Sequence, residues 1–485
     1  MLFNSIDFAL FLPVVVAVYY ALPHRFRWML LLAASYYFYA CWRAEYLLLV
    51  IFSTLVDYWA GLQMARRETK AARRPFLILS LVTNLGLLFT FKYLDFFTGS
   101  LNMAFQAFNI FGELPLFHLL LPVGISFYTF QTLSYSIEVY QGKQQAERHL
   151  GIFALYVSFF PQLVAGPIER ASTLIHQLYE RRDFDYERFS SGIKLMIWGF
   201  FKKIIIGDGL GLFVNAAYGQ PQEHDSLSLL FASVCFAFQI YGDFSGYTDI
   251  ARGTSRLMGF ELMENFRQPY LSRSISDFWR RWHISLSTWF RDYVYIPLGG
   301  NRVVKWRMYY NLFITFTISG LWHGASWTFV IWGALHGFYL MFALATGKIQ
   351  ARFWEVTGIA RVPGLHRVLD TAIVFVLVLI GWVFFRAATV QDAFYILSQI
   401  LNPATYTATF SLVEKVQIIS PFTIATSMFC MLLFLVLDTR SLDREFPAFL
   451  NAMPRGLRWG LMYLLLFCLV FFTPKVTGQF IYFQF

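Results

Sequence analysis

The chain has 485 residues, of which 57% are hydrophobic, 20% aromatic and only 14% charged, with a formal net charge of +10. Soluble proteins carry about 25% charged residues, so this composition excludes an ordinary soluble enzyme. The positive charge does not indicate a nucleic-acid-binding protein, because the Lys and Arg residues are spread over short loops between apolar stretches.

Apolar stretches long enough to cross a membrane recur along the whole chain, beginning with the segment from Ile6 to Leu22. This first stretch lacks the basic start and the small-residue cleavage site of a signal peptide. We therefore predict an all-α polytopic membrane protein with roughly 11 spanning helices plus re-entrant segments.

Basic residues in the connecting loops alternate between the two sides of the predicted membrane. Arg25 and Arg27 follow the first span, the connection at 66–74 holds five Lys or Arg residues, and 98–113 holds none. The connection at 141–149 is basic again. Because cytoplasmic loops carry an excess of Lys and Arg, this pattern predicts that the N-terminus lies outside and the 66–74 loop lies in the cytoplasm.

The segment from Gly151 to Ala165 breaks this alternation. It is short, contains Pro161 and is followed by a stretch of mixed charge that ends at Arg188. A segment that enters the membrane and returns on the same side would restore the pattern, and such backbone persists only where protein or a water-filled cavity surrounds it. We predict a re-entrant segment here.

The longest polar stretch, residues 261–307, lies on the cytoplasmic side by its charge. Within it, residues 274–293 have the periodicity of one amphipathic helix, so that His283 should point inward. Four residues fall on the apolar face of that helix: Trp279, His283, Leu286 and Phe290. The arginines between 280 and 307 suit either the phosphates of a nucleotide-linked donor or lipid headgroups.

One histidine, His323, lies in an apolar stretch that has no Lys, Arg, Asp or Glu between Arg307 and Lys348. An ionisable side chain at membrane depth is costly and therefore marks a functional candidate, and an imidazole suits proton transfer. Together with His283, 40 residues earlier, it could act as base and polariser in acyl transfer to a hydroxyl. The alternative is that each histidine is packed and bonded to a neighbouring carbonyl.

His336 and Asp243 are further candidates. On one helix with His323, His336 would lie roughly 140° away, so a packing or supporting role is expected. Asp243 lies in a segment whose Gly242 and Gly246 indicate close helix packing, with the aspartates bonded to arginines such as Arg252. A place for Asp243 in the wall of a substrate cavity is the alternative.

The other histidines and the cysteines show no catalytic pattern. His24, His149 and His366 lie in predicted loops and are expected to be solvated. The four cysteines are far apart and lack CxxC spacing, which predicts buried, unreactive thiols and neither a zinc site nor disulfides: Cys41, Cys235, Cys430 and Cys468.

Six segments of the chain resemble the membrane-bound O-acyltransferase (MBOAT) family, and most closely its bacterial branch that acetylates alginate and peptidoglycan. The segments are Leu121–Tyr128, Pro161–Ile168, Asp243–Asp249, Glu264–Tyr270, Phe278–Trp289 and Ser319–Gly324. The resemblance implies a multi-helix fold around a central cavity that is open to both sides of the membrane. It also implies that the family's essential intramembrane histidine is His323 and that its second active-site position is His283.

The resemblance further implies an acetyltransferase that takes acetyl groups from cytosolic acetyl-CoA and delivers them across the bacterial inner membrane to an exported or cell-wall polysaccharide such as alginate. It implies a periplasmic acetyltransferase partner and polysaccharide export machinery. We predict no metal site and no nucleic-acid partner. We expect His336 to support the catalytic pair, and five residues to bind substrate: Trp322, Asp243, Trp279, Arg280 and Arg281.

Two alternatives to acetyl transfer stay open. D-alanyl transfer to teichoic acid would use a carrier-protein thioester docked on the cytoplasmic face. A transporter would require paired inverted segments, which the sequence does not show. As an acyltransferase, the chain is predicted to form one integral-membrane domain over 1–485, with N-terminal helices at 1–150, a catalytic core at 151–346 and C-terminal helices at 347–485.

Overall fold

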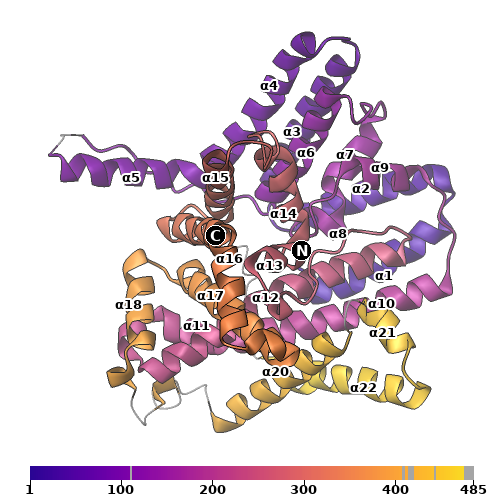
Figure 1. The fold of residues 1–485 in the computed structure, drawn as a ribbon. Helices are drawn as coiled ribbons and strands as arrows, with labels where there is room; N and C mark the ends of the chain where they lie inside the picture. The colour runs from indigo at the N-terminus through magenta and orange to yellow at the C-terminus, as the bar shows by residue number, and fades with distance from the viewer. Residues whose placement is uncertain (110–111, 407–409, 413–419, 442–443, 475–485) are drawn as a thin grey trace. The chain divides into compact units, whose positions relative to one another are not determined.

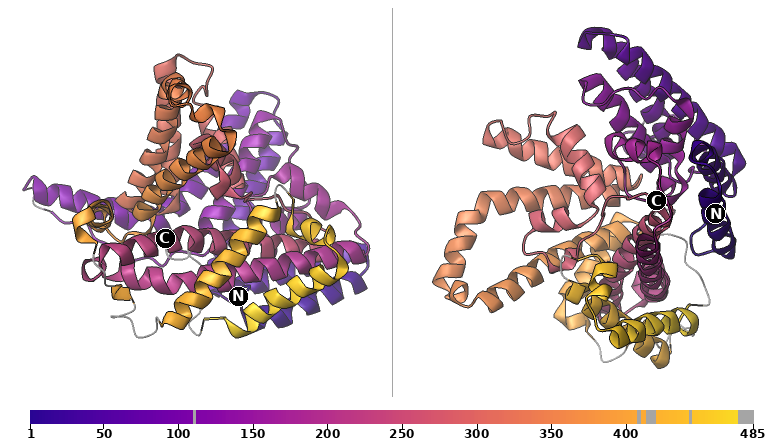
Figure 2. Two further views of the ribbon diagram at one scale, coloured as in Figure 1. Left: turned by 60° about the horizontal axis from the view of Figure 1, so that its bottom comes forward. Right: turned by 90° about the vertical axis from the view of Figure 1, so that its right-hand side faces the viewer.

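The computed structural model describes the chain except for five segments: 110–111, 407–409, 413–419, 442–443 and 475–485. The described residues form helices and no strands (Figure 1), which confirms the all-α prediction. Six of these helices are long and apolar enough to cross a membrane, and a further apolar helix, Ile6–Ala21, is shorter. The total of roughly 11 spans stays a prediction. Figure 2 shows the same helices in two further views.

Contacts within the chain divide it into two compact units, the first formed by Met1–Met196 and Thr248–Met263. The three-part division predicted from the sequence stays a prediction. The helices that lie wholly in the first unit are α1 (Ile6–Ala21), α2 (His24–Ala40), α3 (Ala44–Ala65), α4 (Lys70–Leu88), η1 (Phe89–Tyr93), α5 (Leu94–Ala107), α6 (Ile125–Gln141), α7 (Leu150–Ser158), α8 (Phe160–Leu163) and α9 (Ala171–Tyr179).

Two helices pass from one unit into the other along the chain: α10 (Tyr186–Phe200) and α12 (Ser226–Leu257). The second unit comprises Ile197–Tyr247 and Glu264–Phe485. Its remaining helices are η2 (Phe201–Asp208), α11 (Gly209–Gly219), η3 (Pro221–Glu223), η4 (Pro269–Leu271), α13 (Ile275–Arg281), α14 (Ile284–Phe290), η5 (Arg291–Tyr295), α15 (Lys305–His323), α16 (Trp327–Val356), η6 (Ile359–Arg361), α17 (Pro363–Arg386), α18 (Val390–Leu401), η7 (Pro403–Thr405), α20 (Pro421–Ser441), α21 (Phe446–Asn451) and α22 (Arg455–Phe471).

The segment predicted to be re-entrant folds as two short helices, α7 and α8. The nine residues of α7 rise about 14 Å, roughly half the thickness of a bilayer core. Residues 152–165 are buried throughout. The surrounding protein shields the backbone at the turn between these two short helices, as a re-entrant segment requires, and the re-entrant path itself stays a prediction.

Close helix packing around Gly242 and Gly246 in α12 confirms one interpretation of that segment. A Cβ atom on Gly246 would lie 2.7 Å from the backbone oxygen of Gly199, and one on Gly242 would lie 2.9 Å from that of Lys202. These approaches place α12 directly against η2, a π-helical segment. Small residues are needed at such contacts because any side chain would overlap the facing backbone.

Helices α15 and α16 form an antiparallel pair joined by three residues, and this pair positions His323. Gly320 and Gly333 face each other, so that a Cβ on Gly320 would lie 2.2 Å from the backbone oxygen of Phe329. The chain turns at Gly324, where a Cβ would overlap the Phe329 ring at 2.2 Å. The close approach of the two helices therefore fixes the end of α15, and His323 is its last residue.

The cysteines are all free. Cys235, Cys430 and Cys468 are buried as predicted, but Cys41 is exposed, so the prediction of a buried thiol is wrong there. Cys41 follows the last residue of α2, where the chain leaves the helix.

Candidate active site

The polar stretch that carries His283 is not one amphipathic helix, and that prediction is wrong. Helix α13 ends at Arg281 and α14 begins at Ile284. Between them Trp282 is extended, and His283 adopts a left-handed conformation with φ 44° and ψ 55°. Such a conformation is uncommon outside glycine and persists only where the surroundings hold it in place.

Hydrogen bonds from the preceding loop hold this break open and override the helical periodicity. The backbone oxygen of Asn265 accepts from the Ile284 amide at 2.9 Å, and the Arg267 amide donates to the Arg281 oxygen at 2.9 Å. The Asn265 side-chain oxygen accepts from the Ser285 amide at 3.0 Å. Asn265 thus caps α14 from outside, because His283 offers no side-chain cap.

Asn265 also determines which nitrogen of His283 carries a proton. Its Oδ1 lies 3.2 Å from His283 Nδ1. Since the Ser285 amide can only donate, the atom that it contacts must be the oxygen, and an oxygen can only accept from His283 Nδ1. His283 Nδ1 therefore holds the hydrogen and Nε2 is the acceptor. Burial lowers the pKa of His283 to about 3, so the ring is neutral at physiological pH.

His323 and His283 meet, as the sequence predicted. Their ring centroids lie 6.2 Å apart, and the side chains are 2% and 0% exposed. The cage around His323 consists of Trp322 at 5.0 Å, Trp332 at 4.9 Å and Phe385 at 5.4 Å between centroids. His283 in turn lies 4.7 Å from the Phe244 ring. The pair is therefore enclosed by aromatic rings that exclude bulk water.

His336 lies on α16, a different helix from His323, so the helical-phase argument does not apply to it. Its Nδ1 accepts a hydrogen bond from the Trp279 Nε1–H at 3.3 Å. Trp332 packs against both histidines, with its centroid 5.0 Å from that of His336. His336 therefore holds Trp279 in place and is joined to the cage of His323 through Trp332.

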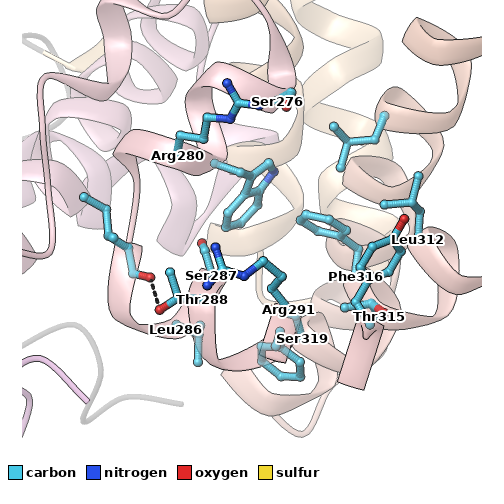
Figure 3. A pocket seen from close by; sticks show the side chains of 15 residues that line it. Ser276, Arg280, Leu286, Ser287, Thr288, Arg291, Leu312, Thr315, Phe316 and Ser319 are labelled. Atoms are coloured by element: carbon cyan, nitrogen blue, oxygen red, sulfur yellow. Dashed lines mark hydrogen bonds between the residues drawn. The ribbon is translucent and has the colours of Figure 1, made fainter. Parts of the chain in front are cut away.

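A pocket of about 520 Å³ lies beside the histidine pair, with α13, α14 and η5 on one side and α15 on the other. Figure 3 shows Arg280 and Arg291 on the first side and Leu312, Thr315 and Phe316 facing them. The pocket runs along Ile284, which follows His283, and Ser319, one turn before His323. Neither histidine is part of its lining.

The structure brings only some of the predicted substrate-binding residues to this pocket. Trp279 and Arg280 line it, and Trp322 belongs to the cage around His323. Arg281 is not in the lining, and its Nε donates to Asp277 Oδ1 at 2.9 Å.

Asp243 also lies outside the pocket lining, in a buried ion cluster. Its Oδ1 is 2.6 Å from Lys203 Nζ, which also reaches Asp208 Oδ1 at 2.7 Å. The packing of η2 against α12 brings Lys203 to Asp243, a partner that the sequence did not predict. Asp249 does lie near Arg252, at 3.8 Å.

Several residues of the site were not predicted from the sequence. Asn265 lies within the segment Glu264–Tyr270, which was noted for its family resemblance but given no role. Three pocket residues of α14 and η5 were given no role: Ser287, Thr288 and Tyr295. Arg291 was predicted only as one of the arginines between 280 and 307 that suit donor phosphates or lipid headgroups. No group of His, Cys, Asp or Glu within the described chain could hold a metal ion.

Known proteins resemble this chain over most of its length. It is 45% identical over 398 residues to the probable alginate O-acetylase AlgI of Pseudomonas aeruginosa, and the matched region covers 81% of this chain and 73% of that protein. It is 35% identical over 429 residues to the peptidoglycan O-acetyltransferase of Helicobacter pylori, covering 82% and 79%. The teichoic acid D-alanyltransferase of Bacillus subtilis is 31% identical over 225 residues, covering 44% and 56%.

The two histidines and the pocket lie within the part of the chain that matches the family profile, residues 148–385. The similarity to the O-acetylases extends well beyond it, over four fifths of the chain. The chain therefore belongs to the membrane-bound O-acyltransferase family.

Proposed function

We propose that this protein moves acetyl groups from cytosolic acetyl-CoA across the membrane for O-acetylation of an exported or cell-wall polysaccharide of the alginate type. The observation that carries the proposal is the contact of two buried imidazoles, 6.2 Å apart, beside a pocket with an arginine-bearing wall. Both relatives that cover most of the chain are named for O-acetyl transfer. Acyl transfer needs a base, a site that excludes water and a pocket for the donor. The histidine pair, the aromatic rings around it and the pocket would supply these three.

In the proposed reaction, His323 is the general base. One ring nitrogen of His323 takes the proton of the attacking hydroxyl while the hydroxyl oxygen bonds to the thioester carbonyl carbon. The carbon–sulfur bond then breaks, and the departing thiolate receives that proton from His323. No net proton is consumed, so a single imidazole can complete the cycle.

His283 is proposed to orient His323. Because Asn265 fixes the hydrogen of His283 on Nδ1, the acceptor Nε2 is available to an N–H of His323. That contact would place the hydrogen of His323 on the nitrogen nearer His283 and leave its other nitrogen as the base. Catalytic hydrogen bonds are often long in an empty enzyme and shorten when substrate binds. Asn265 is therefore a positioning residue for the pair.

The pocket is proposed to hold the donor. Its volume of about 520 Å³ falls within the range of about 300–1,000 Å³ typical of small-molecule sites. Apolar side chains of α14 and α15 suit the pantetheine arm, while Arg280 and Arg291 suit phosphate oxygens. Trp279, held by His336, forms part of the wall and fixes its shape.

The proposed setting is the inner membrane of a bacterium, with the N-terminus outside and the donor on the cytoplasmic side. The basic loops support this orientation. The acceptor polymer would be reached from the opposite side, through a periplasmic acetyltransferase partner and the export machinery.

The first prediction concerns His323. A strain that lacks the gene and carries His323→Ala should export polysaccharide with at least about a hundredfold less ester-linked acetate, because the base is lost. His366→Ala is the matched control, since that histidine lies near Asp370 on α17 and belongs neither to the pocket lining nor to the rings described around His323. Base-released acetate is measured in strains with equal amounts of membrane protein. Normal acetylation by His323→Ala would contradict the proposal.

The second prediction concerns Asn265. Asn265→Ala should lower kcat for thiol release from acetyl-CoA about fivefold, with little change in KM, because a lost orienting hydrogen bond is worth about 1 kcal/mol. Asn265→Asp should recover part of the activity, since it keeps an acceptor oxygen. Ser285→Ala is the control, because it removes a hydroxyl bonded to Oδ1 at 2.9 Å and leaves His283 bonded. If Asn265→Ala and Ser285→Ala behave alike, Asn265 has only a structural role.

The third prediction tests whether Arg280 and Arg291 bind the phosphates of the donor. Arg280→Ala and Arg291→Ala should each raise KM for acetyl-CoA about tenfold and leave KM for acetyl-pantetheine, which has no phosphates, nearly unchanged. Arg302→Ala, an exposed arginine outside the pocket lining, should behave as wild type. Equal effects on both donors would contradict the phosphate-binding role. Faster turnover of an aminoacylated carrier protein than of acetyl-CoA would favour D-alanyl transfer.

A further inference from the structure

A second cavity, of about 200 Å³, lies in the first unit among α2, α7 and α9. Four basic side chains contribute to its lining: His24, Arg25, Arg27 and His149. The sequence predicted His24 and His149 as solvated loop residues, and this is wrong for His24, which is the first residue of α2 and half-buried. His149 is exposed and caps the start of α7. The cavity has no part in the acyl-transfer site proposed above.

Arg27 is a buried cation without a carboxylate partner. It is 9% exposed, and no acid of the described chain forms an ion pair with it. Its Nε donates to the Leu22 oxygen at 3.1 Å and its Nη1 to the Arg182 oxygen, and its guanidinium lies 4.7 Å from the Tyr19 ring centroid. Neutral oxygens and an aromatic face stabilise a buried charge only in part, so an anion in the cavity would be favourable.

The start of α2 also lacks a negatively charged partner. The first turn contains no acidic residue, and Pro23 at the cap position provides no side-chain acceptor. The N-terminus of a helix is the positive end of its dipole, so basic side chains there are unfavourable. An anion bound between the helix end and these side chains would offset the repulsion. His24 adds a further group: its Nε2 contacts the Tyr179 oxygen at 3.2 Å, whereas its Nδ1 is buried and has no hydrogen-bond partner among the described residues.

The acidic residues near the cavity bond to groups other than Arg27. Glu147 Oε1 accepts from the His149 amide and from the Tyr179 hydroxyl, each at 2.7 Å. Glu180 pairs with Arg182. Neither carboxylate neutralises Arg27, so the wall of the cavity keeps a net positive charge.

The size of the cavity and its apolar floor define the class of ligand. A volume of about 200 Å³ is below the roughly 300–1,000 Å³ of typical small-molecule sites, so it suits a phosphate with a small attached group better than a nucleotide. Buried apolar side chains of three helices form the floor: Leu31, Ile152, Leu155 and Leu178. A basic rim above an apolar floor suits the headgroup of an amphiphile.

We propose that this cavity binds the phosphate of an anionic phospholipid headgroup. Arg25 and the 141–149 connection belong to the loops whose charge indicates the cytoplasmic face, where anionic lipids attract basic groups. Arg27 and the first turn of α2 contact the phosphate oxygens, and the floor contacts the glycerol. The bound lipid links α2 to α7 and α9 and stabilises this corner of the first unit.

The test measures lipid binding to the full-length purified protein. Delipidated protein is titrated with phosphatidylglycerol or phosphatidylcholine, and bound lipid is counted by native mass spectrometry. Wild-type protein should bind phosphatidylglycerol more tightly than phosphatidylcholine. Arg25→Gln should weaken the binding of phosphatidylglycerol about fivefold, since one cation near a headgroup contributes about 1 kcal/mol. Arg27→Gln should weaken it at least as much, and Arg25 is exposed, so its variant stays informative if the buried change impairs folding.

Arg74→Gln is the matched control, because Arg74 is an exposed arginine of a basic loop and is not part of the cavity lining. Equal binding by Arg25→Gln and Arg74→Gln would overturn the site. A second arm adds soluble glycerol phosphate as competitor. Displacement of phosphatidylglycerol at equal concentration would overturn the lipid assignment and show that the phosphate comes from a soluble ester, whereas failure to compete supports the membrane lipid.

Discussion

The hydrogen bonds accepted by the two oxygens of Asn265 hold open the chain break between α13 and α14, and the geometry of the candidate active site depends on that break. The break turns the His283 backbone into a left-handed conformation and directs the ring toward the end of α15. In a continuous helix, the same residue would follow the periodicity of its neighbours and the first amides of α14 would be bonded within the helix. One asparagine thereby ends a helix, starts the next and sets the proton position of a histidine.

The aromatic cage is the second constraint on the site. Burying two imidazoles removes them from water, and contacts of about 0.5–1.5 kcal/mol with each neighbouring ring offset part of that cost. Trp332 contributes most directly, because it contacts both His323 and His336. A dry cage also strengthens each hydrogen bond made to the reacting groups, which favours acyl transfer over hydrolysis of the donor. The donor pocket lies outside this cage, so the acyl group would be the only part of the donor that enters the cage.

How much of this arrangement can be predicted from the sequence depends on which contacts are local. His323 stands out because it is ionisable within an apolar stretch. Its pairing with His283 was expected from the inward face of a continuous helix, whereas the structure reaches it through the break between α13 and α14. The all-α fold and the close packing at Gly242 and Gly246 are also predictable, since both arise from composition and residue size.

Other features depend on contacts between distant segments, and sequence periodicity does not reveal them. The loop at 264–268 breaks the helix at His283, although the apolar face of 274–293 continues without interruption. Lys203 reaches Asp243 because a π-helical segment packs against α12, and no local pattern selects it over an arginine. His24 lies at a cavity only because α7 and α9 pack against α2.

The most direct test of the central claim is a structure of the full-length protein with a ketone analogue of acetyl-CoA, in which a CH2 group replaces the thioester sulfur. The account predicts that the phosphates lie at Arg280 and Arg291. It also predicts that the ketone carbon lies about 3–3.5 Å from the position of an attacking oxygen bonded to His323. An analogue whose ketone lies away from both His323 and His283, or which binds outside the pocket, would contradict it.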